Sequence, residues 1–359
     1  MQIGIVGLPF SGKSTLFSTL LRHKTHEPGA KMNAERGVVK VPDERLDKLT
    51  EMFKPKKKVN ATIEYIKVPG LEGESAGTRG LPAQFLANLK TVDALLILVR
   101  AFENEYYPHP LNRIDPKADI EYINSEFLLS DLGIVENRYD KLKKLVNKTQ
   151  DEKDRRELAL FEKLKAHLEQ EKPLREMDFD EHEQLILKGY QFLTAKPVLY
   201  VINIEEKEIP DAEKIEQSFS EYVGKNAAVT SLSAEIEKEI SELDEEDAQV
   251  FMEDLGIKEP ALHKLIRKSY ELLGLISFFT VGEDECRSWP IRKGTNAQKA
   301  AGHIHTDLEK GFIRAETVHY DDLIRLGSMA ACKEHGLVRL EGKDYIVQDG
   351  DILNIRFNV

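Results

Sequence analysis

The sequence predicts a mixed α/β chain: a parallel-sheet domain, a helical insertion within it, and a smaller β-rich domain after it. Short apolar strands alternate with helical segments, which is the order typical of a parallel sheet. A long, highly charged stretch with helical periodicity interrupts that alternation. At 359 residues the chain is long enough for more than one domain. We expect the sheet domain at residues 1–129 and 194–275, the helical insertion at 130–193, and the C-terminal domain at 276–359.

The stretch after the first strand carries the strongest chemical signal. Residues 2–6 form a short apolar strand, and Gly7 to Ser14 reads G-x-x-x-x-G-K-S, the phosphate-binding P-loop pattern. In such a loop, backbone N–H groups curl around an anion, and the following helix points its positive end at it. Lys13 would reach the β- and γ-phosphates, and the Ser14 hydroxyl would take a Mg²⁺ position. The expected phosphate-binding residues are Gly7, Phe10, Ser11, Gly12, Lys13, Ser14 and Thr15.

Three further apolar runs indicate buried parallel strands, at 94–99, 196–203 and 227–231. The second ends at Asn203, and the third leads to Ser233. Ligands of an open parallel sheet bind at the carboxyl ends of its strands. We therefore expect Asn203 and Ser233 to lie near the bound nucleotide.

Apolar residues fall three and four apart between residues 128 and 146, and again between 158 and 168. Charged side chains are dense around both stripes, so each helix can bury only one narrow face. This pattern predicts an antiparallel helical hairpin projecting from the sheet domain. Its charges suit a solvated face, although a projecting hairpin could also contact a partner.

Composition limits where the protein works and what it binds. No run of about 18 apolar residues exists, so we expect no membrane segment, and we interpret the chain as cytoplasmic. Cys286 and Cys332 have no metal-ligand spacing. The net charge of −12 argues against general nucleic-acid binding, and we expect no DNA partner. The basic stretch 54–58 suits either a solvated connection or a local contact with a polyanion such as ribosomal RNA.

The last 85 or so residues change character. Strand-like runs surround one helical segment at 297–309, an arrangement typical of the ubiquitin-like grasp fold. At this point the chain resembles the YchF/Obg-like ATPase family over nearly its whole length. The motifs that carry the resemblance are Gly7-Leu-Pro, Gly12-Lys-Ser-Thr15, Pro42-Asp-Glu-Arg-Leu46, Val99-Arg-Ala-Phe102, Asn203-Ile-Glu-Glu206, and the tail from Phe278 through 300–313 to Asp349-Gly-Asp351.

The resemblance implies a P-loop domain, a coiled-coil insertion and a C-terminal TGS domain. It also implies ATP hydrolysis and ribosome binding. In GTPases of this class the base-reading motif is N-K-x-D, whose Asp accepts hydrogen bonds from guanine. This chain has Ile204 in place of the Lys and Glu206 in place of the Asp. Asn203 can still serve a purine. We expect Asn203, Ile204, Glu206 and Ser233 to bind the base, with ATP preferred over GTP.

Two positions depart from the family in the switch segments. Counting back from Gly37 places Lys31 where switch I normally supplies a Thr to the metal. The D-x-x-G of switch II is Lys67-Val-Pro-Gly70 here, so a lysine replaces the metal-supporting Asp. Leu71 stands in place of the water-orienting glutamine of many GTPases, as it does in the family. The two lysines leave the role of Mg²⁺ open.

Two classes of function follow. The chain is a slow ATPase whose nucleotide state controls ribosome or translation-factor contacts, or it is an adaptor that binds ATP and hydrolyses it negligibly. Lys13 and Ser14 favour the first, and Lys31 and Lys67 favour the second. A GTP-binding protein is the third alternative.

Overall fold

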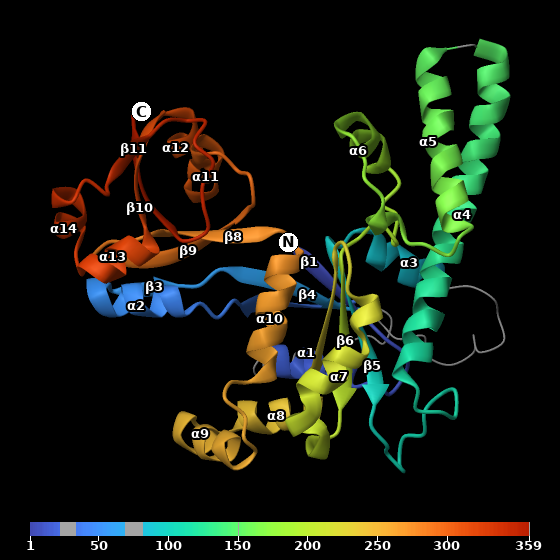
Figure 1. Cartoon of the computed structure of the whole chain (residues 1–359), viewed down its shortest axis with the longest axis horizontal. Helices are drawn as coiled ribbons and strands as arrows, with labels where there is room; N and C mark the ends of the chain where they lie inside the picture. The colour runs from blue at the N-terminus through green and yellow to red at the C-terminus, as the bar shows by residue number, and fades with distance from the viewer. Residues whose placement is uncertain (22–33, 69–81, 150, 359) are drawn as a thin grey trace. The chain divides into compact units, whose positions relative to one another are not determined.

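The structure, a computed structural model, describes residues 1–21, 34–68, 82–149 and 151–358. They form two compact units (Figure 1). The first comprises Met1–Gly37 and Glu64–Leu265, and the second comprises Val38–Ile63 and Ile266–Val359. The segment 38–63, which the sequence places in the nucleotide domain, therefore groups with the C-terminal unit. No helix in the described part of the chain is long and apolar enough to cross a membrane.

The first unit is built on a six-stranded sheet in the order β2-β4-β1-β5-β6-β7. β1 pairs in parallel with β4 and β5, β5 with β6, and β6 with β7. The apolar runs that predicted buried strands correspond to β5, β6 and β7, because only a strand covered on both faces is apolar throughout. The strands are Gln2–Val6 (β1), Glu35–Lys40 (β2), Thr62–Lys67 (β4), Ala94–Ala101 (β5), Val198–Ile204 (β6) and Ala227–Leu232 (β7).

Helices cover both faces of this sheet. On one face, alternate residues of β5 (Leu95, Ile97 and Val99) join a core with α3, α4 and α7. The intervening residues point to the other face, where α1 packs against α8. The helices of the unit are Lys13–Leu20 (α1), Ala83–Lys90 (α3), Pro116–Thr149 (α4), Glu152–Leu168 (α5), Glu181–Leu187 (α6), Ala212–Ser218 (α7), Ala234–Glu242 (α8), Glu245–Asp254 (α9) and Ala261–Leu272 (α10), whose last turns belong to the second unit.

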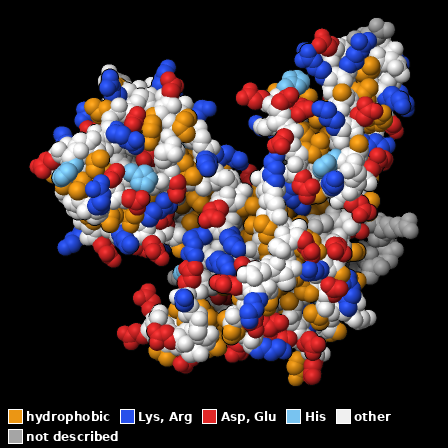
Figure 2. Space-filling model, viewed as in Figure 1, with side chains coloured by type: hydrophobic (Ala, Val, Ile, Leu, Met, Phe, Trp, Pro, Cys, Tyr) orange, Lys and Arg blue, Asp and Glu red, His pale blue; other side chains and the backbone are white. Residues whose placement is uncertain are grey.

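The helical hairpin consists of α4 and α5, and α4 begins at Pro116, before the expected start at residue 130. The N-terminal part of α4 packs on the sheet through Ile120 and Phe127. Its later part packs on α5 through Val135 and Leu142. One continuous helix therefore contributes to two cores. No break in the apolar periodicity of the sequence marks the point where α4 passes from one core to the other. Side chains of both charge signs cover the visible face of the hairpin (Figure 2).

The second unit contains another six-stranded sheet, in the order β11-β10-β12-β8-β9-β3. The expected single helix at 297–309 is two helices, because His305 is extended and caps the second with its Nδ1, which accepts from Asp307 N–H at 3.2 Å. The strands are Lys57–Val59 (β3), Leu275–Thr280 (β8), Glu285–Arg292 (β9), Phe312–His319 (β10), Arg339–Glu341 (β11) and Asp351–Phe357 (β12), and the helices are Glu44–Phe53 (α2), Ala297–Ile304 (α11), Thr306–Lys310 (α12), Tyr320–Leu326 (α13) and Met329–Glu334 (α14).

The segment 38–63 is an integral part of this second unit. Leu46 and Leu49 of α2 are fully buried in a core with Phe279, and β3 pairs in parallel with β9. The basic stretch 54–58 is therefore partly an edge strand rather than a loop. Its lysines 56, 57 and 58 form ion pairs with Asp284, Glu285 and Asp47 respectively. Three of the lysines in this stretch thus have acidic neighbours within the same unit.

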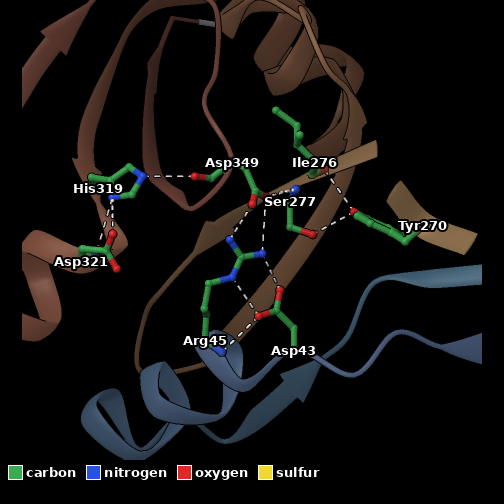
Figure 3. A network of polar contacts seen from close by, with 8 residues as sticks. All are labelled: Asp43, Arg45, Tyr270, Ile276, Ser277, His319, Asp321 and Asp349. Atoms are coloured by element: carbon green, nitrogen blue, oxygen red, sulfur yellow. Dashed lines mark hydrogen bonds and ion pairs between the residues drawn. The ribbon is translucent and has the colours of Figure 1, made fainter. Parts of the chain in front are cut away.

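A polar network fixes α2 to the loop before β12 (Figure 3). Asp43 caps α2 by accepting from Arg45 N–H, and it also accepts from the Arg45 guanidinium. The same guanidinium donates to Asp349 Oδ2 at 2.9 Å, and Asp349 Oδ1 accepts from Ser277 N–H at 2.9 Å. Residues separated by about 300 positions are thus joined through one side chain.

Candidate functional site

The P-loop lies between β1 and α1, in the order that the motif predicts. Two of its glycines are required by geometry. A Cβ on Gly7 would lie 2.3 Å from Leu98 O, and Gly12 has φ +96° with Asn203 Nδ2 2.3 Å from where its Cβ would be. Only glycine combines that backbone angle with so close a neighbour. The loop is therefore shaped by its surroundings as a backbone cradle.

The helix end at this cradle suits an anion. The first helical hydrogen bond of α1 runs from Leu16 N–H to Gly12 O, so the N–H groups of the first turn point beyond the helix end. Lys13 is buried, and its ammonium donates to Gly7 O at 2.9 Å and Leu8 O at 2.7 Å. These bonds hold the Lys13 ammonium against the loop, where a phosphate would approach.

The residues present fit a nucleotide phosphate better than a dedicated metal site. Ser14 is exposed in the first turn of α1, where its hydroxyl can face a nucleotide-bound Mg²⁺. Across the described ranges, no cluster of three His, Cys, Asp or Glu side chains could hold a metal ion. Among the described residues, Ser14 is the side chain that the P-loop motif assigns to such a metal.

Asn203, at the carboxyl end of β6, joins two loops. Its Nδ2 donates to Ser11 O of the P-loop at 3.0 Å, and its Oδ1 accepts from Ala234 N–H at 3.0 Å. The side chain is buried. Asn203, which we expect to bind the base, thus already has a backbone partner for each of its two amide atoms. Each atom keeps one further hydrogen-bonding capacity.

The other expected base-binding residues lie around the same edge of the sheet. Ile204 is buried, and its side chain belongs to the core on the α4 face, so only its backbone faces the site edge. Glu206 is exposed at the start of a short 3₁₀ segment, Glu206–Asp211. Ser233 is buried at the N-cap of α8, and its side chain makes no capping hydrogen bond. Asn203 and Ser233 are brought together, because Asn203 bonds the residue that follows Ser233.

Comparison with known proteins identifies the family. The chain is 45% identical over 365 residues to the Ribosome-binding ATPase YchF of Bacillus subtilis, with both chains covered completely. The chain belongs to the YchF family. It is 38% identical to the Obg-like ATPase 1 of Oryza sativa, covering all of this chain and 92% of that one. The solved structure of the Schizosaccharomyces pombe YchF GTPase matches 99% of this chain and 97% of its own, with 35% identity and a TM-score of 0.87.

Two family profiles match separate parts of the chain. The YchF-GTPase_C profile, described as a protein of unknown function (DUF933), matches residues 275–358, and a profile described as a 50S ribosome-binding GTPase matches residues 2–163. The resemblance predicted from the motifs and the predicted fold class, a P-loop α/β domain with a helical insertion and a distinct C-terminal domain, are both confirmed. Membership in this P-loop family implies nucleotide binding.

Of the four residues expected in the switch segments of this YchF-family chain, Lys67 lies in the part that the structure describes. Lys67 ends β4, and its ammonium pairs with Glu35 Oε1 at 2.5 Å and lies 5.6 Å from the centroid of the Phe17 ring. Phe17 is on α1, one helical turn beyond Ser14. The Lys67 cation is therefore held close to the P-loop helix and does not point into solvent. Lys31, Gly70 and Leu71 lie outside the described residues.

Arg100, in the Val99-Arg-Ala-Phe102 motif, has a role that the sequence does not predict. Arg100 is opposite Asn203 in the β5–β6 register, and it is fully buried. Its guanidinium donates to Phe102 O at 2.8 Å and Tyr107 O at 2.7 Å. A lone arginine within a run of buried apolar strand residues was the signal that could have found it.

Proposed function

We propose that this chain is an ATP-binding, slowly ATP-hydrolysing protein whose nucleotide state controls its contacts with the ribosome, in the cytoplasm. The observation that carries the proposal is the P-loop cradle, with Gly12 packed against Asn203 and Lys13 held at the loop. This arrangement joins a phosphate site to the strand end where the base is expected. The Bacillus subtilis relative, which is named a ribosome-binding ATPase, supports the ribosome as partner.

The base preference rests on the end of β6. A guanine-reading carboxylate has to accept two hydrogen bonds from the base edge, and adenine offers neither donor in that place. Here the position holds Glu206, one methylene longer than Asp, and the preceding lysine is replaced by Ile204, whose side chain is in the core. Neither residue supplies the usual guanine contacts. Asn203 retains one donor and one acceptor capacity for a purine.

We predict that ATP binds at least about 10-fold tighter than GTP, equivalent to about 1.4 kcal/mol. Titration calorimetry of the full chain with both nucleotides measures this difference. Glu206→Asp should narrow the difference in affinity between ATP and GTP. The Ile204→Lys, Glu206→Asp double variant should shift the preference toward GTP. Glu213→Asp, the same change on the exposed face of α7, is the matched control and should leave it unchanged. Equal affinities of the parent for ATP and GTP would refute the assignment.

Ribosome contact is tested by cosedimentation of the chain with purified ribosomes in the presence of ATP, a non-hydrolysable ATP analogue, ADP or no nucleotide. The proposal predicts that the bound fraction with the ATP analogue differs at least several-fold from that with ADP. A bound fraction independent of nucleotide would contradict nucleotide control. Absence of binding in every state would remove the ribosome as the partner.

One observation favours a second candidate, an adaptor that binds ATP without turning it over. Lys67 stands where a metal-supporting carboxylate is expected, and its ammonium is held near α1 by Glu35 and the Phe17 ring. A cation there repels the Mg²⁺ that ordinarily assists phosphoryl transfer. Phosphate release measured under single-turnover conditions separates the two, since the adaptor predicts none above the rate without protein.

A further inference from the structure

The apex of the P-loop carries a large aromatic side chain in an unfavourable backbone conformation. Phe10 has φ +62°, in the left-handed region that residues with bulky side chains rarely adopt. Its ring is 52% exposed, so burial does not stabilise it there. Strain of this kind persists only where the surroundings impose it, and it clusters at ligand sites.

A second exposed aromatic ring meets Phe10. Tyr107, in the loop that follows β5, is 57% exposed, and the centroids of the two rings are 5.5 Å apart at an interplanar angle of 32°. Two neighbouring exposed rings at this separation form an apolar surface with favourable edge and face contacts. Within the described chain this surface is adjacent to the phosphate cradle, because Phe10 belongs to the P-loop itself.

Arg100 holds the loop 102–107 through hydrogen bonds to its backbone. Arg100 is 1% exposed, and among the described residues it forms no ion pair with a carboxylate. Its charge is instead stabilised by the carbonyl oxygens of Phe102 and Tyr107 and by the Phe102 ring, whose centroid is 4.6 Å from Cζ. A buried cation without a carboxylate is costly in a core. Its one evident effect is to hold the 102–107 loop in place.

The position of this loop in the sheet indicates what the rings contact. The sheet order places β5 between β1, which leads into the phosphate loop, and β6, which ends at Asn203. A ring pair made by the P-loop and the loop after β5 therefore lies between the phosphate end and the base end of the site. That is where the sugar and base of a nucleotide would pass.

We propose that Phe10 and Tyr107, held in place through Arg100, form an aromatic shelf against which the nucleoside part of the nucleotide packs. The proposal rests on the nucleotide site described above and adds the contact that distinguishes a nucleotide from a bare polyphosphate. Packing on an aromatic face tolerates any base, so the shelf raises affinity for ATP and GTP alike. Base choice stays with the β6 end.

Calorimetric titrations of the full chain with ATP, GTP and inorganic tripolyphosphate test the shelf. The variants are Phe10→Asn, which removes the ring and tolerates the left-handed backbone, and Tyr107→Ala. Each variant should weaken the binding of ATP and of GTP by a similar factor, about 5- to 50-fold, which is the range expected for one lost aromatic contact. Tripolyphosphate affinity should stay within about 2-fold of the parent, a difference of about 0.4 kcal/mol. Tyr106→Ala is the matched control, since that neighbouring ring is 88% exposed and should leave all three unchanged.

Arg100→Met tests the positioning role through a readout that a purely structural residue would not change. We expect Arg100→Met to weaken ATP binding by about the same factor as Tyr107→Ala. The double variant should lose little further affinity, because both changes act on one loop. Arg100→Lys should recover part of the affinity.

Three results would overturn the shelf. They are unchanged ATP affinity in Phe10→Asn and Tyr107→Ala, an equal loss for tripolyphosphate, and a parent that binds ATP no tighter than tripolyphosphate. Failure of the parent to bind either ligand would instead reject the nucleotide site itself.

Discussion

At the scale of single residues, the nucleotide site depends on side chains that connect loops as well as on those that would touch ligand. Asn203 joins the P-loop to the start of α8, and Arg100 joins the end of β5 to the loop beyond it. The motif predicted that Asn203 belongs to the site. It could not show that both amide atoms bond to backbone, since those partners, Ser11 and Ala234, are distant in sequence.

Lys67 allows a prediction about Mg²⁺. Lys13 and Lys67 are both held near α1, so two fixed cations supply part of the positive charge that a metal otherwise brings to a triphosphate. We expect ATP affinity to change less than about 5-fold when EDTA replaces Mg²⁺, a difference below about 1 kcal/mol. Lys67→Asp should restore a strong Mg²⁺ dependence.

The matched control for this prediction is Lys48→Asp, an identical charge change on an exposed position of α2. It should leave the small EDTA effect as it is in the parent. A large loss of ATP affinity on chelation in the parent would show instead that Ser14 and water hold a metal that the site requires.

At the scale of elements, α8 connects the site edge to α10. Glu237 of α8 is buried, and its carboxylate accepts from Ala261 N–H at 2.7 Å and Leu262 N–H at 3.1 Å, at the N-terminus of α10. Burial raises the pKa of Glu237 to about 7, although the two backbone hydrogen bonds oppose that rise. The carboxyl group thus acts as a cap whose ionisation is costly.

The raised pKa makes a signed prediction about stability. The folded chain holds the Glu237 proton more tightly than the unfolded chain does, so stability falls as pH rises from about 4.5 to about 7. Glu237→Gln removes this titration. Relative to the parent, its free energy of unfolding should improve between pH 5 and pH 8 by on the order of 2–3 kcal/mol. Thermal unfolding followed by circular dichroism at both pH values measures it, with the exposed Glu239→Gln as control. A difference that does not vary with pH would contradict the cap.

The elements also show where sequence reasoning stops. Strands β5, β6 and β7 could be located because continuous apolar runs are nearly confined to buried parallel strands. The start of α4 was missed although its signal is present, because Asp115 Oδ1 accepts from Ala118 N–H at 3.1 Å and Pro116 is the first helical residue. The later passage of the helix from one core to the other shows no change of periodicity. The short strand β3 was hidden in a lysine-rich stretch that reads as a loop unless its acidic partners are known.

At the scale of the whole molecule, the two units are not formed from consecutive stretches of the chain. Segment 38–63 lies in sequence between two strands of the nucleotide unit, and yet it supplies α2 and β3 to the C-terminal unit. Sequence patterns could locate α2 only roughly and missed β3, and they carried no information on which core these elements join. Removing residues from about 274 onward would therefore strip α2 of its packing partners as well as removing the tail.

Arg45 provides a test of this arrangement. Arg45→Met leaves Asp349 without its guanidinium partner and should lower the stability of the C-terminal unit by about 1–3 kcal/mol. The chain has one tryptophan, Trp289, which lies in the core of that unit, so its fluorescence in urea reports this unit selectively. Arg325→Met, which breaks an exposed ion pair with Asp322, should cost less than about 1 kcal/mol. Equal effects of the two variants would show that the Arg45 network does not anchor segment 38–63.

The central claim is that the P-loop of this chain binds ATP, and Lys13→Ala tests it most directly. This change removes the ammonium held at Gly7 O and Leu8 O, the charge aimed at the β- and γ-phosphates. Titration calorimetry of parent and variant with ATP, after circular dichroism has shown that the variant is folded, is the deciding measurement. The account predicts that the parent binds ATP and that the folded variant shows no measurable binding. A folded Lys13→Ala chain that binds ATP as tightly as the parent would contradict it.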